Sequence, residues 1–178
     1  MIRLLETALA RARELAPDDP VASGLVDYLE RHLVEETHSP EPGGAVLDDL
    51  AALGVEADAV RMQIPSPRIA ELVGALYFWI LHYHPVAVLG FVQLEAYHPD
   101  RESVELLIER TGLPREAFGQ LLLHAEVDVG HAAELREVLD SLPLEQRHEE
   151  LIGVSALHSM SCLMDELLDV VDAGAVPA

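Results

Sequence analysis

The sequence predicts a single all-α domain, a bundle of about seven helices. Half of the 178 residues are hydrophobic but only 4% are aromatic, so the core must consist largely of Leu, Val and Ala. These residues favour helices packed on helices. Apolar residues recur at helical spacing, and breaks rich in Pro and Gly separate the helical segments. No segment shows the alternation of a strand. At this length one domain can bury a substantial core without a disulfide.

The first half of the chain contains three helical segments and one long apolar segment. Helices are expected over residues 2–15, 21–37 and 45–53, separated by Pro-Asp-Asp-Pro and by Ser-Pro-Glu-Pro-Gly-Gly. The segment 68–84 is almost entirely apolar and is therefore expected to be a buried helix. Pro85 should kink this helix or begin a new one that continues to about residue 98.

The second half of the chain predicts three more helices. They are expected over residues 102–110, 115–139 and 144–171. Gly112 is the expected C-terminal cap of the first of them. His84 is expected to have a core or capping role. His148 lies in the charged stretch Glu-Gln-Arg-His-Glu-Glu and is expected on the surface.

Charge and composition exclude several classes of protein. The net charge of −21 argues against nucleic acid and against anionic membrane surfaces as partners. All eleven cationic residues are arginine, and the missing lysine excludes Schiff-base chemistry. Cys162, the single cysteine, is expected to be a buried thiol. The N-terminus has no signal-peptide pattern, and His82, His84 and Pro85 interrupt the apolar stretch 72–90. We therefore expect a cytoplasmic protein.

The most informative motif is Leu-Leu-Leu-His-Ala-Glu-Val-Asp-Val-Gly-His. It places His124, Asp128 and His131 at positions i, i+4 and i+7, which lie on one face of a helix. Two imidazoles and a carboxylate at this spacing are typical of half of a non-haem di-iron site. The flanking leucines indicate a helix that faces the core, where an unpaired Asp would be costly. The motif therefore predicts a bound cation.

Two Glu-x-x-His pairs supply further candidate ligands. Glu35 and His38 end the second helix, and Glu95 and His98 follow Pro85. A di-iron site takes about six protein ligands, carboxylates and imidazoles from several helices. Such a donor set favours iron or manganese over copper. Glu36 stays open as the alternative to Glu35, and His98 as the alternative to His38. The candidate ligands are Glu35, His38, Glu95, His124, Asp128 and His131.

The order of these motifs resembles the haem-oxygenase-like di-iron oxidases. The likeness covers about residues 25–140: Glu-Glu-Thr-His, a Leu-Glu in a later apolar helix, and His-x3-Asp-x2-His. The segment Asp-Asp-Leu-Ala-Ala-Leu-Gly that begins at Asp48 resembles this family too, although this chain is shorter than its usual members. The resemblance implies a haem-oxygenase-like bundle with about two Fe(II) ions per chain and O2 as co-substrate. It also implies oxidation of a small organic substrate, such as an amine, an amino acid or a fatty acid.

Two other functions are compatible with the same residues. A metal-free haem-oxygenase-like protein would use them to bind a small molecule. A ferritin-like iron-binding protein would use the pairs Glu35-x-x-His38 and Glu95-x-x-His98 and leave the His124 motif surplus. The oxidase interpretation leaves room for an external electron donor and for a homodimer.

Overall fold

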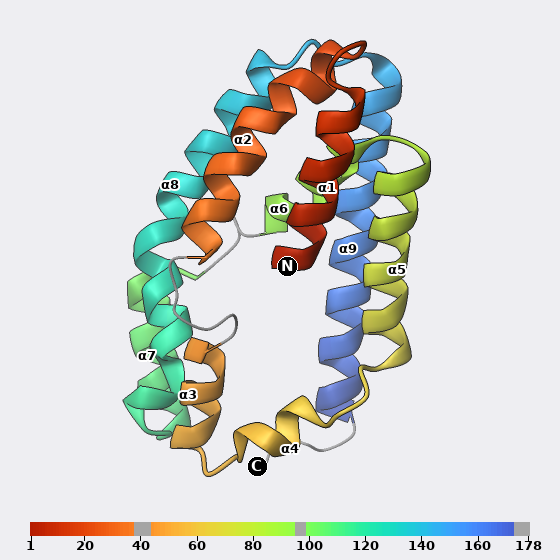
Figure 1. The fold of residues 1–178 in the computed structure, drawn as a ribbon. Helices are drawn as coiled ribbons and strands as arrows, with labels where there is room; N and C mark the ends of the chain where they lie inside the picture. The colour runs from red at the N-terminus through yellow and green to blue at the C-terminus, as the bar shows by residue number, and fades with distance from the viewer. Residues whose placement is uncertain (38–43, 95–98, 173–178) are drawn as a thin grey trace.

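The computed structural model describes residues 1–37, 44–94 and 99–172, which form helices joined by turns and loops (Figure 1). Within these ranges, the side chains of residues 37, 127–131 and 170–172 are outside the description. No strand occurs in the described part, so the all-α class is confirmed. The expected number of seven helices is not confirmed, because the described residues form nine α-helices and the 3-10 helices η1 and η3. The elements are α1 (Ile2–Leu15), α2 (Pro20–Thr37), α3 (Gly44–Ala52), α4 (Ala57–Arg61), α5 (Pro67–His82), η1 (Pro85–Ala87), α6 (Val88–Val92), α7 (Arg101–Thr111), η3 (Arg115–Phe118), α8 (Gly119–Ser141) and α9 (Gln146–Asp172).

Local capping explains where several helices begin and end. Asp19 accepts hydrogen bonds from the backbone N–H groups of Val21 and Ala22 at the start of α2, at 2.9 and 3.0 Å. Asp100 caps α7 in the same way. Gly112 follows α7 with φ of 65°, a left-handed conformation that glycine adopts without strain. The predicted cap at Gly112 is therefore confirmed.

Pro85 separates two helices rather than kinking one. Helix α5 ends at His82, and Nδ1 of His84 then accepts a hydrogen bond from the N–H of Val86 at 3.1 Å. This side-chain contact begins η1, from which the chain continues into α6. The predicted capping role of His84 is therefore confirmed. Residues 95–98, where this segment was expected to end, lie outside the description.

The core of the bundle is centred on η1 and α6, which contact both α1 and α9. All of η1 is buried, and only Phe91 of α6 is not. A Cβ added at Gly90 would lie 2.4 Å from the backbone oxygen of Ile152, so α6 and α9 are in backbone contact. Nearby, the hydroxyl of Ser155 donates to the carbonyl of Ala87 at 2.7 Å. Only glycine at position 90 allows α6 and α9 to approach this closely.

Helix α5 is covered on one side only, so the prediction of a fully buried helix is wrong. Leu72, Leu76 and Ile80 face the core, but Phe78 is 50% exposed and Leu81 is exposed as well. The reason is that the remaining helices pack on a single side of α5. Helices α3 and α4, at the end of the bundle away from the α1–α2 connection (Figure 1), bury no residue.

Candidate functional site

The structure describes only part of the predicted metal site. Helix α8 runs without a break through positions 124, 128 and 131, as the motif predicted. Among the six candidate ligands, only Glu35 and His124 have described side chains. The side chains of Asp128 and His131 are outside the description, as are residues His38, Glu95 and the alternative His98. The six-ligand set therefore stays a prediction.

The two described candidates are accessible. Glu35 is exposed near the end of α2, whereas the alternative Glu36 is half-buried. His124 is half-buried on α8, and its Nε2 is hydrogen-bonded to the side-chain nitrogen of Gln120, one turn earlier. Because an amide nitrogen only donates, Nε2 of His124 accepts and carries a lone pair. A metal ion at Nε2 would need that same lone pair, so it would displace the hydrogen bond from Gln120.

An ion pair links the two helices that carry the ligand motifs. The Nε and Nη2 atoms of Arg31 on α2 lie 3.2 and 3.1 Å from Oε1 of Glu134 on α8. These helices run in opposite directions (Figure 1). One turn beyond Arg31, α2 reaches Glu35, and the same distance back from Glu134 brings α8 to position 131. Glu35 is therefore expected near the level of position 131, the last position of the α8 motif.

The start of α8 is held by a carboxylate from a distant segment. Asp49 of α3 accepts a hydrogen bond from the backbone N–H of Gln120 at 2.8 Å. A Cβ added at Gly119 would lie 2.7 Å from the other oxygen of Asp49, so the glycine makes room for this contact. Helix α8 has no side-chain cap at its own N-cap residue, Phe118. Asp49 therefore positions the turn that carries His124.

Sequence reasoning missed both Asp49 and His32. The segment around Asp49 was noticed only through the family resemblance, because a cap from 71 residues away leaves no local pattern. His32 is 1% exposed on α2 and stacks on Tyr28, with ring centroids 5.4 Å apart. Its only sequence signal was its place one turn before Glu35 and Glu36, which puts it on the same helix as the first ligand pair.

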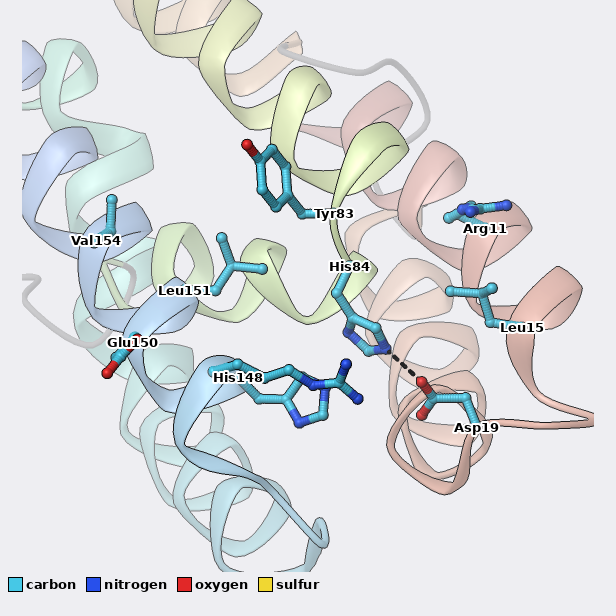
Figure 2. A pocket seen from close by; sticks show the side chains of 10 residues that line it. Arg11, Leu15, Asp19, Tyr83, His84, His148, Glu150, Leu151 and Val154 are labelled. Carbon is cyan, nitrogen blue, oxygen red and sulfur yellow. Dashed lines mark ion pairs between the residues drawn. The ribbon is translucent and has the colours of Figure 1, made fainter.

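The structure brings together a second polar cluster, formed by Asp19, His84 and His148 (Figure 2). It lines a pocket of about 450 Å³ whose apolar wall includes Leu15 and Leu151. Nε2 of His84 lies 3.3 Å from Oδ2 of Asp19, and the two histidine rings are 4.8 Å apart. His148 is only 3% exposed, so its predicted surface position is wrong, because the first turn of α9 packs against His84.

Hydrogen bonding shows that this cluster does not suit a metal ion. Nδ1 of His84 accepts from the N–H of Val86, and Nδ1 of His148 accepts from the N–H of Glu145 at 3.2 Å. In each neutral ring the proton is therefore on Nε2, the atom that a metal would need without its proton. Metal binding would cost both main-chain hydrogen bonds. The cluster instead ties the start of α2 to η1 and α9.

Protonation in the cluster follows from burial and from these contacts. Burial lowers the pKa of His84, although Asp19 acts in the opposite direction, so the imidazole is neutral at neutral pH. Burial alone would raise the pKa of Asp19, but the N–H groups of Ala22 and Val21 together with His84 outweigh it and lower that pKa. The neutral imidazole of His84 therefore lies beside an ionised Asp19, with Nε2 3.3 Å from Oδ2.

A third group, formed by Glu71, His158 and Cys162, lies between α5 and α9. Sγ of Cys162 is 3.5 Å from Nε2 of His158, whose ring meets Trp79 edge to face. Burial raises the pKa of the Cys162 thiol, so it stays protonated at neutral pH. Cys162 is buried, as the sequence predicted. Binding a metal at this group would require the loss of the thiol proton.

The comparisons with known proteins identify no family. The chain matches no protein-family model, no curated protein and no solved structure.

Proposed function

We propose that this protein is an O2-dependent non-haem di-iron oxidase or oxygenase with a haem-oxygenase-like bundle, acting on a small organic substrate. One observation carries the proposal. His124, Asp128 and His131 follow one another at i, i+4 and i+7 on the unbroken helix α8. The Arg31–Glu134 pair, which links α2 to α8 one turn from Glu35, supports it.

The donor set fits iron. The proposed ligands are carboxylates and imidazoles without a thiolate, which suits Fe(II). Nε2 of His124 accepts from Gln120, so iron binding at that atom would replace this hydrogen bond. A net charge of −21 also favours cation uptake. When bound, the iron would supply the activation of O2.

The chain's own residues would then divide two tasks. Carboxylates such as Glu35, Glu95 and Asp128 can bind terminally or bridge two ions, so they would accommodate a change in metal charge. The imidazoles of His38, His124 and His131 would hold the ions in place and tune their potential. Asp49 and Arg31 would act as positioning residues, since they fix the two helices without being ligands.

The test is an anaerobic Fe(II) titration of the purified chain, followed by exposure to O2. We expect about two irons per chain and O2 consumption. Asp128→Ala should lose at least one iron, and the matched control Asp140→Ala, an exposed Asp on the same helix, should keep both. Single replacements of Glu35, Glu36, His38 and His98 by Ala would decide the two alternative ligand positions.

The same titration separates the other two functions. A ferritin-like protein that binds iron through Glu35, His38, Glu95 and His98 would keep its iron in Asp128→Ala. A metal-free binding protein would take up no iron at all. Either result would overturn the oxidase proposal.

A further inference from the structure

We infer that the outward face of α9 is the interface of a homodimer in which α9 packs against α9 of a second copy. This inference is independent of the proposed function, because it uses no candidate metal ligand. It rests on an apolar stripe that the described part of the chain leaves uncovered. The exposed apolar residues of the stripe are Val154, Leu157, Met160, Met164, Leu167 and Leu168.

The spacing of the stripe is that of a helix–helix seam. Val154, Leu157, Ser161, Met164 and Leu168 follow one another in steps of three and four, the heptad pattern of helices that pack in pairs. Leu157, near the middle, is 75% exposed. A solvent-facing helix surface normally carries charges, yet no charged residue occurs from 151 to 164. The stripe is therefore a second apolar face, besides the one that packs on the core.

The charged residues that follow are paired with residues at the start of α5. Arg68 of α5 pairs with Asp165 at 3.1 Å and with Asp169 at 2.7 Å. Ser66 donates to Glu166 at 2.6 Å. These contacts direct the acidic groups toward α5 and leave the outward stripe apolar.

The apolar surface continues from α9 onto α5. Val154 and Tyr83 line the same pocket, and the ring of Tyr83 lies 5.5 Å from that of Phe78, which is also exposed. From their exposed fractions, the stripe with these two rings leaves on the order of 800 Å² accessible, which matches the share of one partner in a standard interface. It also exceeds the largest apolar patch of a typical monomer.

A second copy fits this surface better than a membrane does. A two-fold axis joins identical patches, so the stripe would meet its own apolar surface. The small side chain of Ser161 in its middle allows two helices to approach closely. Helix α9 is long and apolar enough to cross a membrane, by length and composition only. However, a net charge of −21 repels an anionic bilayer. That charge also opposes dimerisation at low salt and is screened at higher salt.

Sedimentation equilibrium over a range of chain concentrations tests the inference. We expect a dimer whose affinity increases as NaCl is raised. Leu157→Glu should raise the dimer dissociation constant by about 100-fold or more, since it buries a charge at the centre. Leu106→Glu, an exposed leucine on α7, should leave the dimer unchanged. Circular dichroism of both variants confirms that they fold. A monomeric wild-type chain, or a dimer that survives Leu157→Glu, overturns the inference.

Crosslinking and vesicle flotation give independent readouts. Ser161→Cys should be joined to its counterpart by a short bismaleimide, whereas the wild-type chain, with only the buried Cys162, should not. A matched cysteine at exposed Glu137 on α8 should give no crosslink. Flotation of a monomeric wild-type chain with zwitterionic or anionic vesicles would instead identify the stripe as a membrane contact and overturn the dimer.

Discussion

The two ends of this bundle are packed very differently. Around η1 and α6 almost every side chain is buried, and Gly90 brings two helix backbones into contact. At the other end, α3 and α4 bury no residue, and α7 buries only Val104. The two described ligand candidates are not buried either: Glu35 is exposed and His124 is half-buried. The well-packed end therefore stabilises the fold. In α2 the buried residues end at His32, before Glu35, and in α8 the described buried residues begin at Leu135, after His124.

This difference suggests a division of labour between the two ends. Regions with few buried apolar contacts open most easily, and binding sites are often drawn from them. A metal ion bound by several helices would stabilise their packing, because its ligands rarely come together before it binds. Four predictions test this comparison, from the largest expected effect to the smallest.

The first prediction concerns the contact between α6 and α9. Gly90→Ala should lower the free energy of unfolding by about 3 kcal/mol or more, because the new methyl group would meet backbone atoms, which cannot rotate away. Urea denaturation measures the change. The matched control is Gly74→Ala on α5, where the added methyl meets no atom within 4 Å. This control should be neutral or stabilising, by up to about 1 kcal/mol. Equal midpoints for the two variants would contradict the comparison.

The second prediction concerns Fe(II). Saturating iron should slow amide hydrogen exchange in α8 and at the end of α2. At a free iron concentration of 100 times the Kd, the free energy of opening should rise by about 2.7 kcal/mol. The already protected amides of η1 and α6 should show a much smaller change. Gly130 weakens α8 locally, so we expect this helix to be partly disordered without metal. Equal protection of α8 with and without iron would show this expectation to be wrong.

The third prediction concerns Asp49. Asp49→Ala removes the cap of α8 and should cost about 1 kcal/mol of stability, with faster amide exchange near Gln120 and weaker iron binding. Asp49→Asn keeps an oxygen acceptor and should retain most of both properties. If Asp49→Ala and Asp49→Asn behave alike, the contact to Gln120 does not position the helix.

The fourth and smallest effect is an acid-sensitive loss of stability at the well-packed end. Burial lowers the pKa of His84 below its ordinary value of 6.5, so the unfolded chain binds a proton more readily than the folded one. The stabilisation is complete above that value and decreases as the pH falls below it. Asp19, whose pKa is also lowered, adds a further loss below its ordinary value of 3.8. Urea midpoints measured between pH 7.5 and 5 would detect the effect of His84.

A pair of asparagine variants isolates the histidine. His84→Asn retains a side-chain oxygen that can accept from Val86 but removes the titration, so its midpoints should change less with pH. His82→Asn, at the exposed neighbour, should behave like the wild-type chain. An unchanged pH dependence in His84→Asn would show that other groups cause it.

Much of the secondary structure could be predicted from the sequence. The apolar period and the Pro and Gly breaks located α1, α2, α7 and α8 to within a few residues, because these signals act over one or two turns. The break at Pro85 and the cap at Gly112 are equally local. The short helix α4 was missed, because its five residues bury nothing and leave no apolar period.

Burial and long-range contacts could not be predicted in this way. His148 lies in a charged stretch but is buried, and Phe78 lies in an apolar stretch but is half exposed, because each depends on which helix packs beside it. The cap from Asp49 and the pair between Arg31 and Glu134 join segments 71 and 103 residues apart. The sequence by itself determined the helical segments, the spacing of the candidate ligands and the excess of negative charge. Only the tertiary structure decided the register of α2 against α8, the histidine cluster and the uncovered face of α9, because these depend on which surfaces meet when the helices pack.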